Sequence, residues 1–321
     1  MIVLWRITER CNYACGFCAY DRRLGRPRTQ TDAYDVLRLG AVLGQYARAT
    51  GDRVLVSWLG GEPLLWPPLF EVSGALRDDG LAVSLTTNGS LLHRPGVRAA
   101  LLDHLDEVTV SVDAMAGLHD ELRGFEGAWA RCRDAIVALR QMRDLRGYGP
   151  KLRANVVLMR ATLPEFGRLC AALADWGVDE ITFNQLGGRD RPEFYPSQQL
   201  RPDDVAALGG QLPGLKATLA DRGVRLCGAP RYLDRFAATA AGEAWPVQDC
   251  AMGERMLFVD ERGRVAPCSF SSDDYGAPIA DVQSAQDLLD LPRRFRAARD
   301  AAPCPTCADC PSTQVFAKFD A

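Results

Sequence analysis

The chain has 321 residues, of which 47% are hydrophobic and 25% are charged, and its formal net charge at pH 7 is -3. These values are ordinary for a globular protein, and the length suits one large domain with a small one. Because no block of like charge is present, neither nucleic acid nor an anionic membrane is expected as a partner. The lack of a signal peptide and of a long apolar run predicts a cytoplasmic protein.

Strand-like runs alternate with helix-like runs from residue 1 to about residue 222. The strand candidates are rich in Val, Ile, Leu and Thr, as in strands buried on both faces. They cover residues 2–8, 53–58, 81–87, 107–113, 152–158 and 180–185, and helical patterns cover residues 32–49, 69–78, 97–105, 128–144, 163–176 and 202–221. This alternation predicts an α/β fold whose parallel sheet is either open or a partly closed barrel, with functional groups where the strands end.

The pattern changes after residue 222. Helical periodicity weakens, cysteines reappear, and residues 257–259 and 264–267 flank a turn that contains Gly263, as in a β-hairpin. We therefore predict a barrel domain over residues 1–222 and a small cysteine-rich domain over residues 223–321.

Eleven cysteines are unusual for a cytoplasmic chain, where clustered cysteines indicate metal ligands or catalytic groups rather than disulfides. Cys132 and Cys170 stand alone in helical segments and are interpreted as small buried hydrophobes. The other nine lie toward the two ends of the chain.

Cys11, Cys15 and Cys18 directly follow the first strand. Three thiolates in one short loop suit an iron–sulfur cluster, and the missing fourth ligand would leave one iron open. The alternative is a structural zinc site, which would need a fourth protein ligand. The histidines that might supply it are remote in sequence: His93, His104 and His119.

This CxxxCxxC pattern, with Phe17 before its last cysteine, resembles the signature of the radical S-adenosylmethionine (SAM) superfamily. The resemblance implies a partial (β/α)6 TIM-like barrel and a 4Fe–4S cluster whose open iron is chelated by the amino and carboxylate groups of SAM. It also implies reductive cleavage of SAM to a 5′-deoxyadenosyl radical that abstracts a substrate hydrogen.

Further segments match the family in the same order. The run Gly60, Gly61, Glu62 and Pro63 resembles the motif that receives the SAM ammonium, and two glycines allow close approach of a backbone. Arg123, in a run that resembles HDxxRG, would pair with the SAM carboxylate. The remaining implied pocket residues are Asn88, Ser111, Asp113 and, as weaker matches that could equally be strand-end caps, Asn155 and Asn184.

A second group of cysteines begins with Cys250 and Cys268, which form a C-x12-G-x4-C pattern around Gly263. The pattern resembles the start of the SPASM and Twitch extensions of radical SAM enzymes and implies an auxiliary 4Fe–4S cluster. A zinc ribbon completed by Cys304 and Cys307 is the alternative.

The chain then departs from the full SPASM pattern, because it offers only the CxxCxxC run of Cys304, Cys307 and Cys310. This suits one auxiliary cluster, closer to Twitch, while a second one stays open, as does the choice among the last three cysteines. A spare thiol, Cys227 or Cys310, is a candidate hydrogen-atom donor to a substrate radical, and an inert buried thiol is the alternative.

The resemblance implies maturation of a ribosomally synthesised peptide, with a separate leader-peptide-binding protein and an electron donor such as flavodoxin or ferredoxin. The alternative is a dehydrogenase or epimerase of a small hydroxylated molecule such as an aminoglycoside. A non-catalytic metal-binding protein would not need Glu62 and Arg123. Residues 189–191, Phe194 and Tyr195 follow the sixth strand and either contact substrate or form a solvated loop.

Overall fold

A computed structural model describes residues 1–188, 190–247 and 250–320. Within this part of the chain, the strands form one sheet in the order β10-β9-β8-β1-β2-β3-β4-β5-β6-β7. Strands β1 to β7 and the β1–β8 pair are parallel, whereas β9 runs antiparallel to β8 and β10. The bounds are β1 Ile2–Thr8, β2 Leu55–Gly60, β3 Ala82–Thr87, β4 Glu107–Ser111, β5 Lys151–Leu158, β6 Glu180–Gln185, β7 Arg225–Leu226, β8 Met256–Val259, β9 Arg264–Ala266 and β10 Ala277–Pro278.

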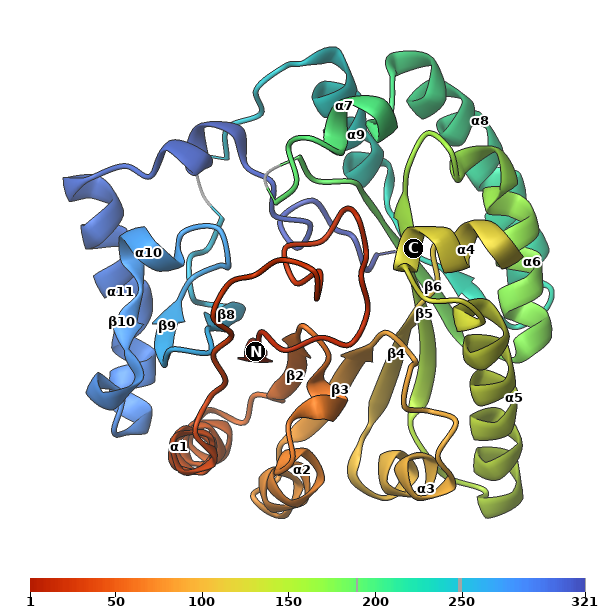
Figure 1. The fold of residues 1–321 in the computed structure, drawn as a ribbon. Helices are drawn as coiled ribbons and strands as arrows, with labels where there is room; N and C mark the ends of the chain where they lie inside the picture. The colour runs from red at the N-terminus through yellow and green to blue at the C-terminus, as the bar shows by residue number, and fades with distance from the viewer. Residues whose placement is uncertain (189, 248–249, 321) are drawn as a thin grey trace.

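The curved sheet is covered on its outer side by helices, as in a partial TIM barrel (Figure 1). The prediction of an α/β fold with a partial barrel is therefore confirmed. The helices are α1 Ala33–Thr50, α2 Leu69–Asp78, α3 Pro95–His104, α4 Ala116–Arg123, α5 Ala128–Arg146, α6 Phe166–Trp176, α7 Tyr195–Gln198, α8 Pro202–Ala220, α9 Pro230–Ala241, α10 Ser272–Tyr275 and α11 Ala285–Ala301, with short 3-10 turns at Pro63–Leu65, Leu163–Glu165, Ile279–Asp281 and Pro305–Asp309.

Local signals set where these elements begin and end. At the start of α1 the Asp32 carboxylate accepts the Tyr34 N–H, and the helix ends at Gly51, whose φ of 76° suits a residue without Cβ. In β5, side chains alternate between the fully buried outer face, which packs on helices, and the half-buried barrel interior. The inward-facing residues of β5 thus line the interior of the barrel.

The C-terminal third is more helical than its sequence pattern indicates. The expectation that helical periodicity fades after residue 222 is wrong, because α9 and α11 lie there. The predicted hairpin is confirmed: β8 and β9 pair antiparallel, and Gly263 in their turn has a φ of 75°. Since β8 also pairs with β1, the C-terminal segment joins the barrel sheet directly. The domain division at residue 222 stays a prediction.

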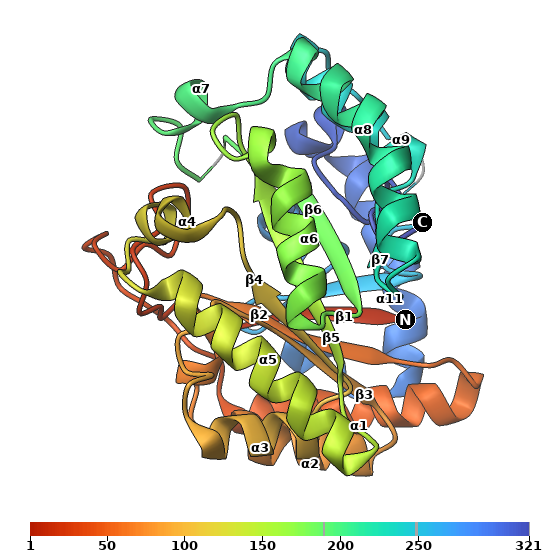
Figure 2. The ribbon, with the colours of Figure 1, turned by 90° about the vertical axis from the view of Figure 1, so that its right-hand side faces the viewer.

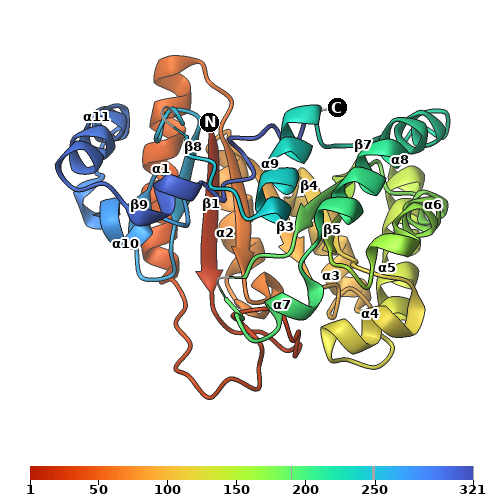
Figure 3. The same ribbon diagram turned by 90° about the horizontal axis from the view of Figure 1, so that it is seen from above.

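The two ends of the sheet carry different parts of the chain. The loop after β1, α4 and α7 gather where the strands end, and both chain termini lie where the strands begin (Figures 2 and 3). No helix in the described ranges has the length and apolar character needed to cross a membrane.

The continuous core predicts that the described residues unfold together. Phe295 of α11 is buried in the same apolar cluster as Trp5 and Trp58 of the barrel strands. We expect Phe295→Ala to cost about 3–5 kcal/mol and to lower one common thermal transition, followed by circular dichroism. Tyr148→Ala, at an exposed position, should change stability by less than about 0.5 kcal/mol. Two transitions, of which only one shifts, would contradict a shared core.

Candidate active site

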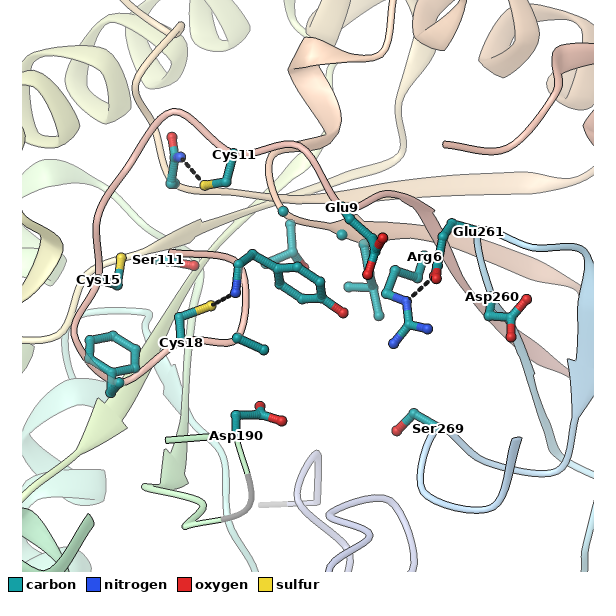
Figure 4. A pocket seen from close by; sticks show the side chains of 18 of the residues that line it. Arg6, Glu9, Cys11, Cys15, Cys18, Ser111, Asp190, Asp260, Glu261 and Ser269 are labelled. Atoms are coloured by element: carbon teal, nitrogen blue, oxygen red, sulfur yellow. Dashed lines mark hydrogen bonds and ion pairs between the residues drawn. The ribbon is translucent and has the colours of Figure 1, made fainter. Parts of the chain in front are cut away.

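A cavity of about 650 Å³ opens where the parallel strands end (Figure 4). Its walls come from the loop after β1, the ends of β2 to β5, α4 and the turn between β8 and β9, which is the part of an α/β barrel where functional groups gather. Ten of the residues that the motifs single out line it: Cys11, Cys15, Phe17, Cys18, Gly60, Gly61, Asn88, Ser111, Arg123 and Asn155. Four others do not line it: Glu62, Pro63, Asp113 and Asn184.

The three N-terminal cysteines surround one part of the cavity (Figure 4). Burial raises the pKa of the Cys11 thiol to about 11 and that of Cys15 to about 12. Free thiolates are therefore disfavoured here at neutral pH. A bound cationic metal group would offset this cost, because coordination deprotonates a thiol.

Backbone contacts hold the cysteine loop in place. The Ala14 N–H donates to the Arg123 carbonyl at 3.1 Å, and Tyr13 stacks on Phe125 with ring centroids 4.9 Å apart. Gly124 has a φ of 58°, and a Cβ there would lie 2.5 Å from the Ala14 carbonyl oxygen. The loop after β1 and the end of α4 are thus packed backbone against backbone.

The double glycine lets the end of β2 approach the same loop from the other side. The Gly61 N–H donates to the Thr8 carbonyl and the Glu62 N–H to the Arg10 carbonyl, both at 2.7 Å. A Cβ on Gly61 would lie 2.2 Å from the Arg10 carbonyl oxygen. Only glycine fits this position without moving the residue that precedes Cys11.

The Glu62 carboxylate turns away from the cavity and supports the loop after β3. It accepts hydrogen bonds from the Thr87 hydroxyl at 2.8 Å and from the Asn88 N–H at 2.7 Å. Burial raises the pKa of Glu62 to about 7. The supported Asn88 side chain donates to Asn12 at 3.0 Å and reaches within 3.7 Å of the Cys11 sulfur, so Glu62 acts on the cysteine loop through a neighbour.

Arg123 brings a buried positive charge to the cavity. One of its terminal nitrogens lies 2.6 Å from the Asp113 carboxylate, and its guanidinium lies 5.6 Å from the centre of the Phe17 ring. Asp113 is in turn held by the Val157 N–H at 2.9 Å. The Arg123 Nε, although buried, has no hydrogen-bond partner among the described residues. The site can therefore accept a further anionic group.

The far side of the cavity contains polar residues that sequence reasoning missed. Arg6 of β1 forms an ion pair with Glu261, and Asp260 and Ser269 lie beyond this pair (Figure 4). The turn between β8 and β9 supplies Asp260 and Glu261, and it reaches the cavity only because β8 pairs with β1. A sequence signal existed in the charged hairpin turn, but nothing indicated that pairing.

The segment after β6 also meets the cysteine loop. Phe194 lies 3.4 Å from where a Cβ on Gly16 would stand, and its ring is 6.2 Å from that of Phe17. Arg191 contacts Asp21 at 3.1 Å. Arg189 lies outside the described residues. The aromatic part of this segment therefore packs on the cavity rim.

A second cavity, of about 290 Å³, contains four cysteines. Cys250, Cys268, Cys307 and Cys310 line it, whereas Cys304 does not, although it is buried and its N–H donates to the Tyr275 hydroxyl. Within the described ranges, no three His, Cys, Asp or Glu side chains converge as they would on a single metal ion.

The two cavities share a wall formed by the segment after β9. Cys268 and Ser271 face the second cavity, and Ser269 and Ser272 face the first. Strand β8 likewise has Met256 at the second cavity and Phe258 at the first. The two cysteine groups, far apart in sequence, therefore lie in adjoining spaces.

The other cysteines lie away from both cavities. Cys132, Cys170 and Cys227 are fully buried and line neither. The Cys132 sulfur would be 2.7 Å from a Cβ on Gly89, so it packs under the loop after β3. Its burial, like that of Cys170, agrees with a role as a small hydrophobe.

The three thiols and Arg123 lie in a part of the chain that matches a known family. Residues 5–144 match the Radical SAM superfamily. The chain belongs to this superfamily and is a radical SAM enzyme, whose cofactors are a 4Fe–4S cluster and SAM.

Two curated relatives cover most of the chain. An AdoMet-dependent heme synthase of Oleidesulfovibrio alaskensis is 23% identical over 86% of this chain and 71% of its own length. A PqqA peptide cyclase of Xanthomonas euvesicatoria is 25% identical over 98% of this chain and 80% of its own length.

Solved structures share the fold at lower identity. Streptococcus suis SuiB bound to S-adenosylmethionine superposes with a TM-score of 0.68 at 17% identity, covering 97% of this chain and 72% of SuiB. Native anSMEcpe with bound AdoMet gives a TM-score of 0.67 at 17% identity, covering 97% of this chain and 88% of that protein. The likeness therefore includes the C-terminal extension.

The contact between Gly61 and the Arg10 carbonyl predicts a sensitive position. We expect Gly61→Ala to displace the loop that carries Cys11. After anaerobic reconstitution the variant should therefore lack most of the iron of the wild-type protein, as measured by iron and sulfide analysis. Gly96→Ala is the matched control, because a Cβ there meets nothing within 4 Å. Full iron content in a folded Gly61→Ala variant would show that the loop tolerates the added methyl.

Proposed function

We propose that the chain modifies a peptide by radical chemistry. The observation that carries this is the pair of adjoining cysteine-lined cavities, in a chain that resembles a PqqA peptide cyclase over 98% of its length. Two of the structurally similar proteins have been solved with bound peptides, SuiB with the precursor peptide SuiA and anSMEcpe with the Cp18Cys peptide.

The residues of the first cavity fit the SAM-binding cluster. Cys11, Cys15 and Cys18 would hold three irons, and the unpaired Arg123 Nε would receive the SAM carboxylate. The backbone at Gly60 and Gly61 would approach the SAM ammonium. When bound, the cluster and SAM together supply a 5′-deoxyadenosyl radical that removes a substrate hydrogen.

The protein's own part is to position these groups and to exclude water. Asp113 fixes the Arg123 guanidinium, and Glu62 fixes the loop that carries Asn88. Phe17 and Phe194 supply apolar surface beside the cysteine loop. Ser111, at the end of β4, offers a hydroxyl to the same space.

For the second cavity, we infer an auxiliary 4Fe–4S cluster on Cys250, Cys268, Cys307 and Cys310. Four thiols that line one cavity match the usual ligand set of such a cluster. This choice leaves Cys304 as the spare thiol of the C-terminal run. It also makes Cys310 a ligand, so the hydrogen-donor role stays a prediction for Cys227 alone, which would have to reach the first cavity.

Iron counting tests this ligand set. We expect the wild-type protein to bind about eight irons, and each of Cys250→Ala, Cys268→Ala, Cys307→Ala and Cys310→Ala to fall toward about four. Cys304→Ala is the matched control and should keep about eight. A Cys304→Ala variant that loses iron, beside a Cys307→Ala or Cys310→Ala variant that does not, would reassign the ligands.

One feature favours the second candidate function, oxidation or epimerisation of a small hydroxylated molecule such as an aminoglycoside. Four carboxylates line the first cavity, at Glu9, Asp190, Asp260 and Asp273. They would complement amino groups of a substrate. An electron donor such as flavodoxin or ferredoxin and a cytoplasmic location suit either function.

SAM cleavage distinguishes the two candidates. The reduced holoenzyme should release 5′-deoxyadenosine faster when a peptide substrate is present, and aminoglycosides should have no such effect. Stimulation by the aminoglycoside alone would transfer the assignment to small-molecule chemistry. If neither substrate nor strong reductant yields 5′-deoxyadenosine, the proposed cofactor site is wrong.

A further inference from the structure

The C-terminal segment, residues 313–320, is anchored where the barrel strands begin. The Arg225 guanidinium donates to the Phe319 carbonyl at 3.2 Å, and the Gly228 N–H donates to the Asp320 carbonyl at 2.8 Å. Phe316 is fully buried, with its ring 5.9 Å from that of Trp245. The segment is thus a built part of the barrel's lower wall, opposite the end that holds the cysteines.

Lys318 extends from this segment into the barrel. The residue is only 8% exposed, and its ammonium donates to the Asn155 Oδ1 at 2.9 Å. Burial, assisted by the charge of Arg153, lowers the pKa of Lys318 to about 7. A desolvated lysine is costly, and no carboxylate forms an ion pair with it among the described residues. Its link to Asn155 therefore calls for an explanation.

Asn155 connects Lys318 to the active-site cavity. Its Oδ1 also accepts from the Thr182 hydroxyl at 3.0 Å and from the Asn184 Nδ2 at 3.1 Å. Asn155 lines the cavity that holds the N-terminal cysteines, and its Nδ2 has no hydrogen-bond partner in the described ranges. The amide thus has one end fixed by the barrel and the other end free to serve a ligand.

Lys318 acts together with the Asn184 Nδ2, and both donate to the same oxygen of the Asn155 amide. In its charged form Lys318 has three donors and no acceptor, so only the amide oxygen can face it. Hydroxyl groups such as that of Thr182 can accept as well as donate, and would tolerate a flipped amide. The Asn155 N–H groups are consequently directed to the cavity.

We propose that Lys318 is a positioning residue that fixes Asn155 as a hydrogen-bond donor to SAM, so that the C-terminal segment tunes SAM affinity without touching it. This rests on the proposal that SAM occupies the first cavity. The recognised chemistry is an acceptor oxygen, of the kind that the carboxylate and ribose hydroxyls of SAM supply.

SAM affinity of the anaerobically reconstituted holoenzyme, measured by equilibrium dialysis, tests the proposal. Lys318→Met should weaken binding by about tenfold, the equivalent of one hydrogen bond. Lys318→Gln, whose amide can accept as well as donate and so would tolerate a flipped Asn155, should lose affinity to a similar extent. Asn155→Asp retains an acceptor for Lys318 but has no N–H, and should lose affinity as much as Lys318→Met.

Lys216→Met is the matched control. The Lys216 ammonium donates to the Gly228 carbonyl at 2.8 Å, next to the segment's anchor, but does not contact Asn155. It should bind SAM as the wild type does. Equal losses in Lys216→Met and Lys318→Met, or wild-type affinity in Lys318→Met, would overturn the proposal.

A double substitution separates a positioning role from general weakening of the fold. If Lys318 acts through Asn155, Lys318→Met combined with Asn155→Ala should bind SAM no more weakly than Asn155→Ala alone. Additive losses of affinity in the double variant would overturn the proposal. If Lys318→Met does not fold, Lys318→Gln and Asn155→Asp still test it. Failure of the cofactor-site assignment is distinct, because the wild-type protein itself would then neither bind nor cleave SAM.

Discussion

The close approach of three backbone segments around the loop after β1 is the constraint on which the site depends. Gly61 on one side and Gly124 on the other leave no room for a Cβ against the carbonyls of Arg10 and Ala14. The loop cannot shift toward either neighbour, so its cysteines keep their positions before any metal binds. Preorganisation of this kind lowers the conformational cost of ordering ligands around a cluster.

The site also requires that buried charges be stabilised, and the fold does this differently for Arg123 and for Glu62. Arg123 is compensated by Asp113 yet keeps one nitrogen unpaired, which suits it to an anionic ligand. Glu62 is instead satisfied by several donors within the protein, and its work is to hold the Asn88 loop. A motif residue such as Glu62 can therefore support the site without lining the cavity, and its charged side chain need not face the ligand.

Much of the barrel could be predicted from the sequence because its strands and helices have strong local signals. Residues 2–8 and 180–185 were predicted with the bounds that β1 and β6 have: β1 is mostly apolar, and β6 alternates Ile181 and Phe183 with polar residues. Helices α9 and α11 were not predicted because the clustered cysteines after residue 222 indicated irregular structure, and α11 carries many charged residues and an internal proline. The parallel pairing of β8 with β1 could not be predicted, because it joins residues about 250 positions apart that no local pattern connects.

The same limit applies to the site. The loop cysteines were found because their spacing is local, but the Glu261 contact with Arg6 and the Lys318 contact with Asn155 depend on tertiary structure. Strand β8 explains why such distant residues matter: it runs from the second cavity to the first, and the segment that returns from β9 divides the two. A structural change at the C-terminal cysteines would therefore be transmitted by this short hairpin to the far side of the active-site cavity. Residues beyond the family match at 5–144 therefore bound the cavity at its side, and Lys318 contacts its wall residue Asn155 from the opposite end of the barrel.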